Sequence, residues 1–244
     1  MTSHLSCRLF YLLFRVPLLC GTLCLTLARA DGIVISPTLV TLAPDQHTQI
    51  VTLQNNSPQP RYYQVQLFAW QQQAGENLYA QQDSLLVTPP ISEVPAGEQQ
   101  LIRIIRPSRS APTREQSYRL IISEIPDDSS GTGVLAVDML LRLSLPVFAQ
   151  GTTPAQATLN ARLTPHQAGQ QVSLHNLGGR HARLTHGEWL FSDDSARPWQ
   201  AGLIGYVLPG QTMQWPAGEL PEQPRALRLR VNGTTQTLTL GETP

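Results

Sequence analysis

The sequence contains no lysine, so its 17 basic residues are all arginines, and they balance 17 acidic residues to a formal net charge of zero. Without lysine, Schiff-base chemistry and a lysine nucleophile are excluded, and any cationic anchor must be an arginine. A neutral chain gives no bulk electrostatic reason to bind nucleic acid or a membrane surface. The composition therefore points away from nucleic-acid partners.

Cysteine is almost as scarce, because all three cysteines lie within the first 30 residues. That segment carries arginines around apolar runs and ends in Ala28-Arg29-Ala30, the small-x-small pattern of a signal-peptide cleavage site. Its uninterrupted apolar run, 16–27, is shorter than the roughly 20 residues that a membrane span needs. Residues 1–30 are predicted to be a cleaved signal peptide, which leaves an exported chain without disulfides or a stable membrane insertion.

Short alternating segments separated by turn signals fill the rest of the chain. About seven of them lie in 31–150 without a convincing helical period, which favours an immunoglobulin-like β-sandwich. Residues 151–155 belong to a polar stretch rich in threonine and proline and are predicted to be a linker. Residues 156–244 predict a second all-β domain, in which Asn232-Gly233 marks a hairpin turn.

No motif for catalysis or metal binding stands out. His175, His181 and His186 cluster, but spacings of six and five do not match common zinc-ligand spacings, and solvated strand or turn histidines are the simpler interpretation. The sequence shows no nucleophile elbow, phosphate-binding glycine loop or metalloprotease helix. We therefore expect no enzyme activity, no catalytic residue, no metal and no cofactor.

The most unusual stretch is "GVLAVDMLLRLSLPVFA", residues 133–149. Its odd positions from 135 to 145 are all apolar, the period-2 pattern of a strand with one buried face. The alternation is roughly twice as long as an average strand of about 5–6 residues. Such a long apolar face requires something to pack against.

Three arginines lie inside predicted strands: Arg103 in "LIRII", Arg119 in "SYRLII" and Arg142 in "LLRLS". An arginine on the wet face of a half-buried strand is the simplest interpretation of each. The alternative is that one or two of them line a cleft and bind a carboxylate through charge-assisted hydrogen bonds.

Several segments together resemble the PapD-like periplasmic pilus chaperones of the chaperone–usher pathway. They are "LLVTPPISEVPAGEQQLIRIIR", "REQSYRLIISEIP", "RLSLPVFA", "LHNLGGRHARL", "GYVLPGQ" and "VNG". In this order, the segments extend over nearly the whole chain after residue 30. The "TPP", "YRL" and "SLPVF" forms are most similar to the archaic branch, which includes Csu-type chaperones and assembles spore-coat-U-like pilins.

The resemblance implies two immunoglobulin-like domains in a boomerang arrangement and a periplasmic protein that folds and caps pilin subunits. It implies that strand 134–145 is lent to a pilin whose own sandwich lacks its last strand. Leu135, Val137, Met139 and Leu141 would enter the pilin groove, while residues 143–148 would pack in the chaperone itself. An outer-membrane usher would then receive the subunit.

In the best-known branch, a first-strand arginine and a donor-strand lysine hold the subunit's terminal carboxylate. By position, the corresponding residues here are Leu39 and Ser144, so the carboxylate anchor must lie elsewhere. The resemblance favours Arg119 first, Arg103 second and Arg142 third, because a guanidinium can bind a carboxylate bidentately.

Two alternatives remain open from the sequence. An exported pilin-like structural protein is one, although archaic pilins usually carry cysteines and a donor segment near their N-terminus. A sugar-binding module is the other, with Trp189, Trp199 and Trp215 as a platform, although packing is the commoner role of tryptophans in sandwiches.

Overall fold

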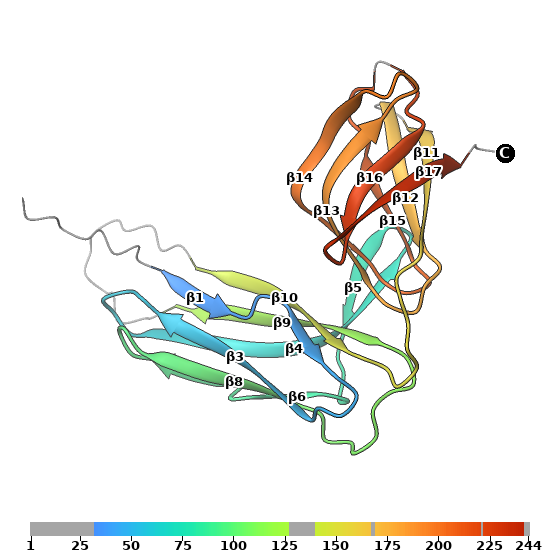
Figure 1. The fold of residues 1–244 in the computed structure, drawn as a ribbon. Coiled ribbons are helices and arrows are strands. Elements are labelled where there is room, and N and C mark those ends of the chain that lie inside the picture. The colour runs from blue at the N-terminus through green and yellow to red at the C-terminus, as the bar shows by residue number, and fades with distance from the viewer. Residues whose placement is uncertain (1–31, 127–139, 167–168, 221, 242–244) are drawn as a thin grey trace, which may run out of the picture. The chain divides into compact units, whose positions relative to one another are not determined.

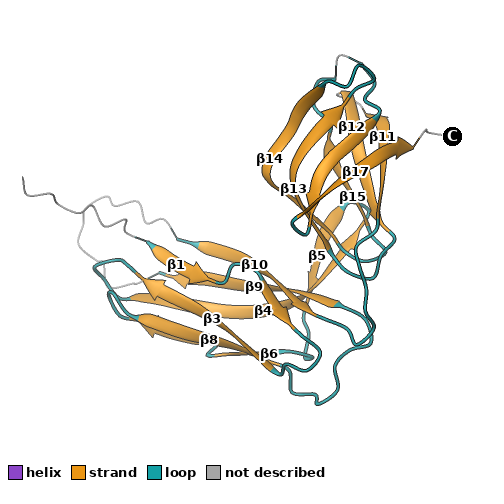
Figure 2. Ribbon diagram, in the orientation of Figure 1, coloured by secondary structure: helices purple, strands orange, loops and turns teal. Residues whose placement is uncertain are grey.

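The computed structural model describes residues 32–126, 140–166, 169–220 and 222–241 (Figure 1). Within these ranges the chain forms seventeen β-strands and no helix (Figure 2), so the predicted all-β class is confirmed. No helix in the described ranges is long and apolar enough to cross a membrane. The predicted signal peptide, 1–30, lies outside the described residues.

Ten strands form two sheets in the first part of the chain. One sheet has the order β1-β3-β8-β6, and the other has the order β2-β10-β9-β4-β5 with β7 also paired to β4. The strands are β1 (Ile33–Ser36), β2 (Val40–Leu42), β3 (Thr48–Asn55), β4 (Arg61–Gln73), β5 (Glu76–Ala80), β6 (Leu86–Thr88), β7 (Ile91–Val94), β8 (Gln99–Ile105), β9 (Gln116–Ile125) and β10 (Arg142–Ala149).

The period-2 alternation of these strands places one apolar row of each sheet in a shared core. Tyr63, Val65 and Leu67 of β4 are buried, and Gln64 and Gln66 between them are exposed. Apolar residues of β2, β3, β8, β9 and β10 complete the same cluster. These two sheets are the first sandwich of the molecule, with its core running from Val40 to Ala149 in sequence.

Seven strands follow in the second part of the chain, in the order β14-β13-β16-β17-β11-β12-β15. They form the second sandwich around a separate core that Trp189, Phe191, Leu174 and Leu227 dominate. The strands are β11 (Leu159–His166), β12 (Gly169–Asn176), β13 (Ala182–Leu190), β14 (Ala196–Val207), β15 (Thr212–Pro216), β16 (Ala226–Val231) and β17 (Thr234–Gly241).

The hairpin predicted at Asn232-Gly233 is confirmed. Val231 of β16 lies opposite Thr234 of β17, so the turn has two residues. Both residues have a positive φ, 50° at Asn232 and 89° at Gly233, as a turn of this kind requires.

Residues 31–244 belong to one compact unit, and a third, small cluster joins the two sandwiches. It contains Trp70 and Phe148 of the first sandwich and Tyr206 and Leu208 of the second. Side chains of the two sandwiches therefore pack together around this cluster, beside the segment between β10 and β11.

Candidate functional site

The burial of β10 changes along the strand. Leu145, Val147 and Phe148 are buried in the protein's own cores, and Leu143 packs partly buried against the first core. Leu141, just before the strand, is 36% exposed. The prediction that residues 143–148 pack at home is therefore confirmed. The predicted donor residues Leu135, Val137 and Met139 lie outside the described residues.

One edge of β10 is largely open. On one side the strand pairs with β9 along its whole length, but on the other side β2 pairs only with residues 147–149. Residues 142–146 have no second strand partner among the described residues. Pro146, which has no N–H to donate, lies in this segment, as expected of an edge. An edge with unpaired backbone groups can accept an added strand.

Arg119 lies on the outer face of the sheet that contains β10. In β9 it is opposite Phe68 of β4 and Pro146 of β10, and its neighbours Tyr118 and Leu120 are buried on the core side. The guanidinium carbon lies 3.8 Å from the centroid of the Trp70 ring and 5.6 Å from that of Tyr206. Arg119 is therefore not a freely solvated strand arginine.

Among the described residues, the guanidinium of Arg119 has no counter-charge. Its Nε is buried without a hydrogen-bond partner, and within the described ranges no carboxylate forms an ion pair with it. Burial lowers the pKa of Arg119, while the phenols of Tyr79 and Tyr206 act in the opposite direction. A bound anion would supply both the missing charge and the missing hydrogen-bond acceptor.

The other two candidate arginines have different surroundings. Arg103 is exposed on β8, between buried Ile102 and Ile104, so it lies on the outer face of the opposite sheet. Arg142 is exposed at the start of β10, opposite Ser123. The structure does not bring Arg103 and Arg119 together. The preference for Arg119 over Arg103 as the carboxylate anchor stays a prediction.

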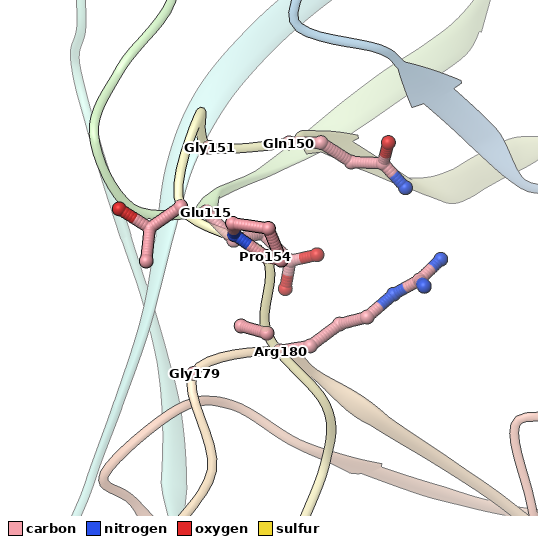
Figure 3. Close-up of a pocket in the computed structure, with 8 residues that line it drawn as sticks. Glu115, Gln150, Gly151, Pro154, Gly179 and Arg180 are labelled. Atoms are coloured by element: carbon pink, nitrogen blue, oxygen red, sulfur yellow. The ribbon is translucent and has the colours of Figure 1, made fainter.

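A cavity of about 250 Å³ lies beside the segment between the sandwiches, lined by Glu115, Gly151, Pro154, Gly179 and Arg180 among others (Figure 3). The Oε1 atom of Glu115 accepts hydrogen bonds from the backbone N–H of His181 and, at 3.0 Å, from its Nδ1. Both side chains are almost fully buried. The Phe148 ring stacks on the His181 ring at 3.5 Å. This pair connects the two sandwiches.

Two of the three clustered histidines and all three tryptophans take part in hydrogen bonds or packing, whereas His186 is exposed on β13. His181 pairs with Glu115, and Nδ1 of His175 lies 2.8 Å from Oγ1 of Thr212. No group of three potential metal ligands occurs in the part of the chain that the structure describes. Trp189, Trp199 and Trp215 belong to or pack against the second core, and the Trp189 and Trp199 rings lie 5.3 Å apart.

Residues 32–154, just over half of the chain, match the family described as "Pili and flagellar-assembly chaperone, PapD N-terminal domain". The chain therefore belongs to this family of pilus chaperones. Because the family is one of chaperones, the expectation that the protein is not an enzyme is confirmed, and a pilin-like or sugar-binding role is not favoured. No curated protein matches the chain in sequence.

Solved structures share the two-domain fold. A chain of the CsuC–CsuE chaperone–tip adhesion subunit pre-assembly complex from archaic Csu pili of Acinetobacter baumannii is 22% identical, with a TM-score of 0.69 over 87% of this chain and 100% of that one. A chain of the SafA pilin–SafB chaperone complex of Salmonella enterica is 16% identical, with a TM-score of 0.63 over 86% of this chain and 97% of that one. The CupB2 chaperone of Pseudomonas aeruginosa is 18% identical, with a TM-score of 0.58 over 85% of this chain and 100% of that one.

Sequence reasoning missed the residues that surround Arg119. Trp70 and Tyr206 lie 136 positions apart in the numbering, and only the packing of the two sandwiches brings them to one guanidinium. A weak signal existed for Trp70, because the alternation of β4 puts it on the face opposite Val65 and Leu67. The sequence carried no comparable signal for Tyr206.

Proposed function

We propose that this protein is a periplasmic chaperone that caps pilin subunits by lending them strand 134–145 and delivers them to an outer-membrane usher. The observation that carries the proposal is the open edge of β10, which continues in sequence into an apolar alternating stretch. Membership of the pilus-chaperone family and the likeness to chaperones solved with pilins support it.

In this proposal, strand 134–145 adds to the open sandwich of a pilin. Main-chain hydrogen bonds supply affinity, and Leu135, Val137, Met139 and Leu141 fill the pilin groove. Leu141 is exposed and Leu145 is buried. This change supports the assignment of residues up to Leu141 to the pilin, because it marks where the strand leaves the first core.

Arg119 is the proposed anchor for the carboxylate at the end of the pilin chain. Its guanidinium has no counter-charge among the described residues. Its strand, β9, pairs directly with β10, where Arg119 lies opposite Pro146. A planar guanidinium can bind a carboxylate with two parallel hydrogen bonds. Arg103 is the second candidate and, on the opposite sheet, a natural control.

The proposal of strand donation is tested by co-expression with pilin genes that neighbour the chaperone gene, followed by pull-down from the periplasm. Val137→Asp should abolish the pilin complex while the chaperone stays folded, because a carboxylate would be buried unpaired in an apolar groove. Ala136→Asp, on the other face of the same strand, is the matched control and should retain the pilin. Equal capture of the pilin by wild type and Val137→Asp would overturn the proposal.

The carboxylate anchor is tested separately with Arg119→Ala and Arg103→Ala. Loss of a charge-assisted pair of hydrogen bonds should weaken pilin binding about tenfold to a hundredfold in the first variant. The second should bind as wild type. If Arg119→Ala leaves the pilin affinity unchanged, Arg119 is not the anchor, and a loss in Arg103→Ala would transfer the role to Arg103.

The proposed divisions of the chain are a cleaved signal peptide, 1–30, a first domain, 31–150, a linker, 151–155, and a second domain, 156–244. The two separate cores support the division into domains. Mass spectrometry of the protein from periplasm should find Asp31 as the first residue. An intact N-terminus in that fraction would contradict the cleavage.

A further inference from the structure

Aromatic rings from both sandwiches hold the guanidinium of Arg119. Trp70 of β4 is in direct stacking range at 3.8 Å, and Tyr206 of β14 lies at 5.6 Å. These two rings are themselves in edge contact, with centroids 5.5 Å apart and an angle of 79° between their planes. Arg119 thus rests against a two-ring support to which each sandwich contributes one ring.

Hydrogen bonds fix the ring of Trp70 and the backbone that carries Tyr206. The Nε1 atom of Trp70 donates to Oδ1 of Asn77 at 2.8 Å. The side-chain amide of Gln72 donates to the carbonyl of Tyr206 at 3.0 Å and accepts from the backbone N–H of Leu208 at 2.8 Å. Because Gln72 is buried, this bridge locks the end of β14 to the end of β4.

β10, into which the proposed donor strand 134–145 continues, contacts the same support through Phe148. The Phe148 ring lies 5.9 Å from that of Trp70 and 6.0 Å from that of Tyr206. Phe148 is the penultimate residue of β10, in the part of the strand that pairs with β2, and residues 142–146 of the same strand form the open edge. The two-ring support is therefore continuous with the strand that binds the pilin in the proposed function.

Contact with an aromatic face stabilises a guanidinium without using its N–H groups. The contact thus leaves the N–H donors of Arg119 available for a carboxylate, and the buried Nε has no partner in the described residues. An arginine side chain otherwise loses much rotamer freedom when it binds. Rings that hold it beforehand reduce that loss and so increase the affinity for the anion.

We infer that Trp70 and Tyr206 are positioning residues that hold Arg119 ready for the terminal carboxylate of the pilin, so that the anchor is complete only with both sandwiches in place. The inference rests on the proposed function of Arg119. It adds that the second sandwich, which supplies Tyr206, contributes to recognition of the subunit's terminus.

The test uses the pilin captured by co-expression, prepared with a free C-terminal carboxylate and with a C-terminal amide. The measured quantity is the ratio of the two affinities for the full-length chaperone. Wild type should prefer the carboxylate form. Tyr206→Leu should reduce this preference about threefold to thirtyfold, the effect of one cation–π contact. Tyr206→Phe keeps the ring and should retain the preference, and Trp70→Phe should retain part of it.

Each outcome has a distinct meaning. If Arg119→Ala leaves the preference intact, the anchor itself is wrong. If Arg119→Ala abolishes it and Tyr206→Leu does not change it, the anchor stands and the positioning role is overturned. An equal loss of affinity for the carboxylate and amide forms in Tyr206→Leu would show a merely structural role and would also overturn the inference.

Discussion

The two sandwiches end on strands with the same place in the fold and different chemistry. β10 pairs antiparallel with β9 and parallel with β2, and β17 pairs antiparallel with β16 and parallel with β11. The exposed face of β17 carries Thr235, Thr237 and Thr239. β10 instead emerges from the exposed Leu140 and Leu141. A long apolar strand favours strand addition and a polar one discourages it, so strands in the same place in the two sandwiches differ in their side chains and not in the fold.

The sandwiches also share a buried asparagine corner. Asn55 is the last residue of β3 and Asn176 is the last residue of β12, and both are buried. Each Oδ1 accepts from the backbone N–H two residues later, and each Nδ2 donates to the carbonyl four residues later and to a distant valine. The partners are Ser57, Gln59 and Val94 in the first sandwich, and Gly178, Arg180 and Val207 in the second. Two halves without close sequence similarity thus use one structural device.

The largest expected effect comes from removing either corner. Asn55→Ala and Asn176→Ala each leave several buried backbone groups without partners, which should lower the free energy of unfolding by about 3 kcal/mol. Urea denaturation followed by circular dichroism measures the loss. Hydrogen exchange resolved along the chain should show that each variant loosens its own sandwich first. If only one variant is destabilised, the two corners are not equivalent.

The corners differ at the residue two positions after the asparagine, which predicts the next largest effect. A Cβ at Gly178 would collide with the carbonyl oxygen of Gln156 and lie 2.7 Å from the backbone N of Thr158. The equivalent Ser57 has room, and its hydroxyl donates to Oδ1 of Asn55. Gly178→Ala should cost about 2 kcal/mol because backbone atoms must move. Ser57→Gly should cost about 1 kcal/mol for the lost hydrogen bond and the added backbone freedom.

Thermal unfolding of both variants in parallel checks this order. Gly178→Ala should have the lower melting temperature. If Ser57→Gly is the more destabilised variant, the clash at Gly178 is relieved by an adjustment of the segment before β11. That result would mean that the two corners are more alike than the contacts indicate.

High pH should destabilise the first sandwich more than the second. The two tyrosines with raised pKa values, Tyr63 and Tyr118, both lie in the first sandwich. Burial, helped by Glu124, raises the pKa of Tyr63 to about 12 from 10.0. The folded state thus keeps a proton that the unfolded chain releases, so stability is full below pH 10 and falls as the pH rises toward 12.

Tyr63→Phe should therefore weaken this alkaline loss of stability, since phenylalanine has no proton to release. Urea midpoints of wild type and variant at neutral pH and near pH 11 measure the effect. A parallel fall of both midpoints with pH would show that Tyr63 does not contribute.

The smallest effect is expected at an exposed ion pair of the second sandwich. Nε of Arg228 lies 2.7 Å from Oε1 of Glu188, and this hydrogen bond lowers the pKa of Glu188 from 4.5. The pair contributes stability above that pH, which is lost as the pH falls through the lowered pKa. Glu188→Gln should shift the urea midpoint slightly at neutral pH and not at all in strong acid. An equal shift at both pH values would point to packing instead of charge.

The local elements of this fold were predictable because they depend on neighbours in the sequence. The alternation in β4 and β10 predicted the buried rows that contain Val65 and Leu145, and Asn232-Gly233 predicted its hairpin. The interpretation of the candidate site was less complete. Arg103 and Arg119 occupy nearly identical apolar strand contexts in the sequence, yet one is exposed and the other is stacked on Trp70.

The sequence by itself determined that the protein is built of strands, which face of each strand is apolar and how far the alternating stretch 133–149 extends. A period of two residues is enough to establish these points, because successive side chains point to opposite faces. Only the tertiary structure decided what covers each face. It placed Tyr206 beside Arg119, paired Glu115 with His181 and, among the described residues, left residues 142–146 of β10 with one strand partner. Contacts between distant segments follow from how the sheets pack and not from local pattern.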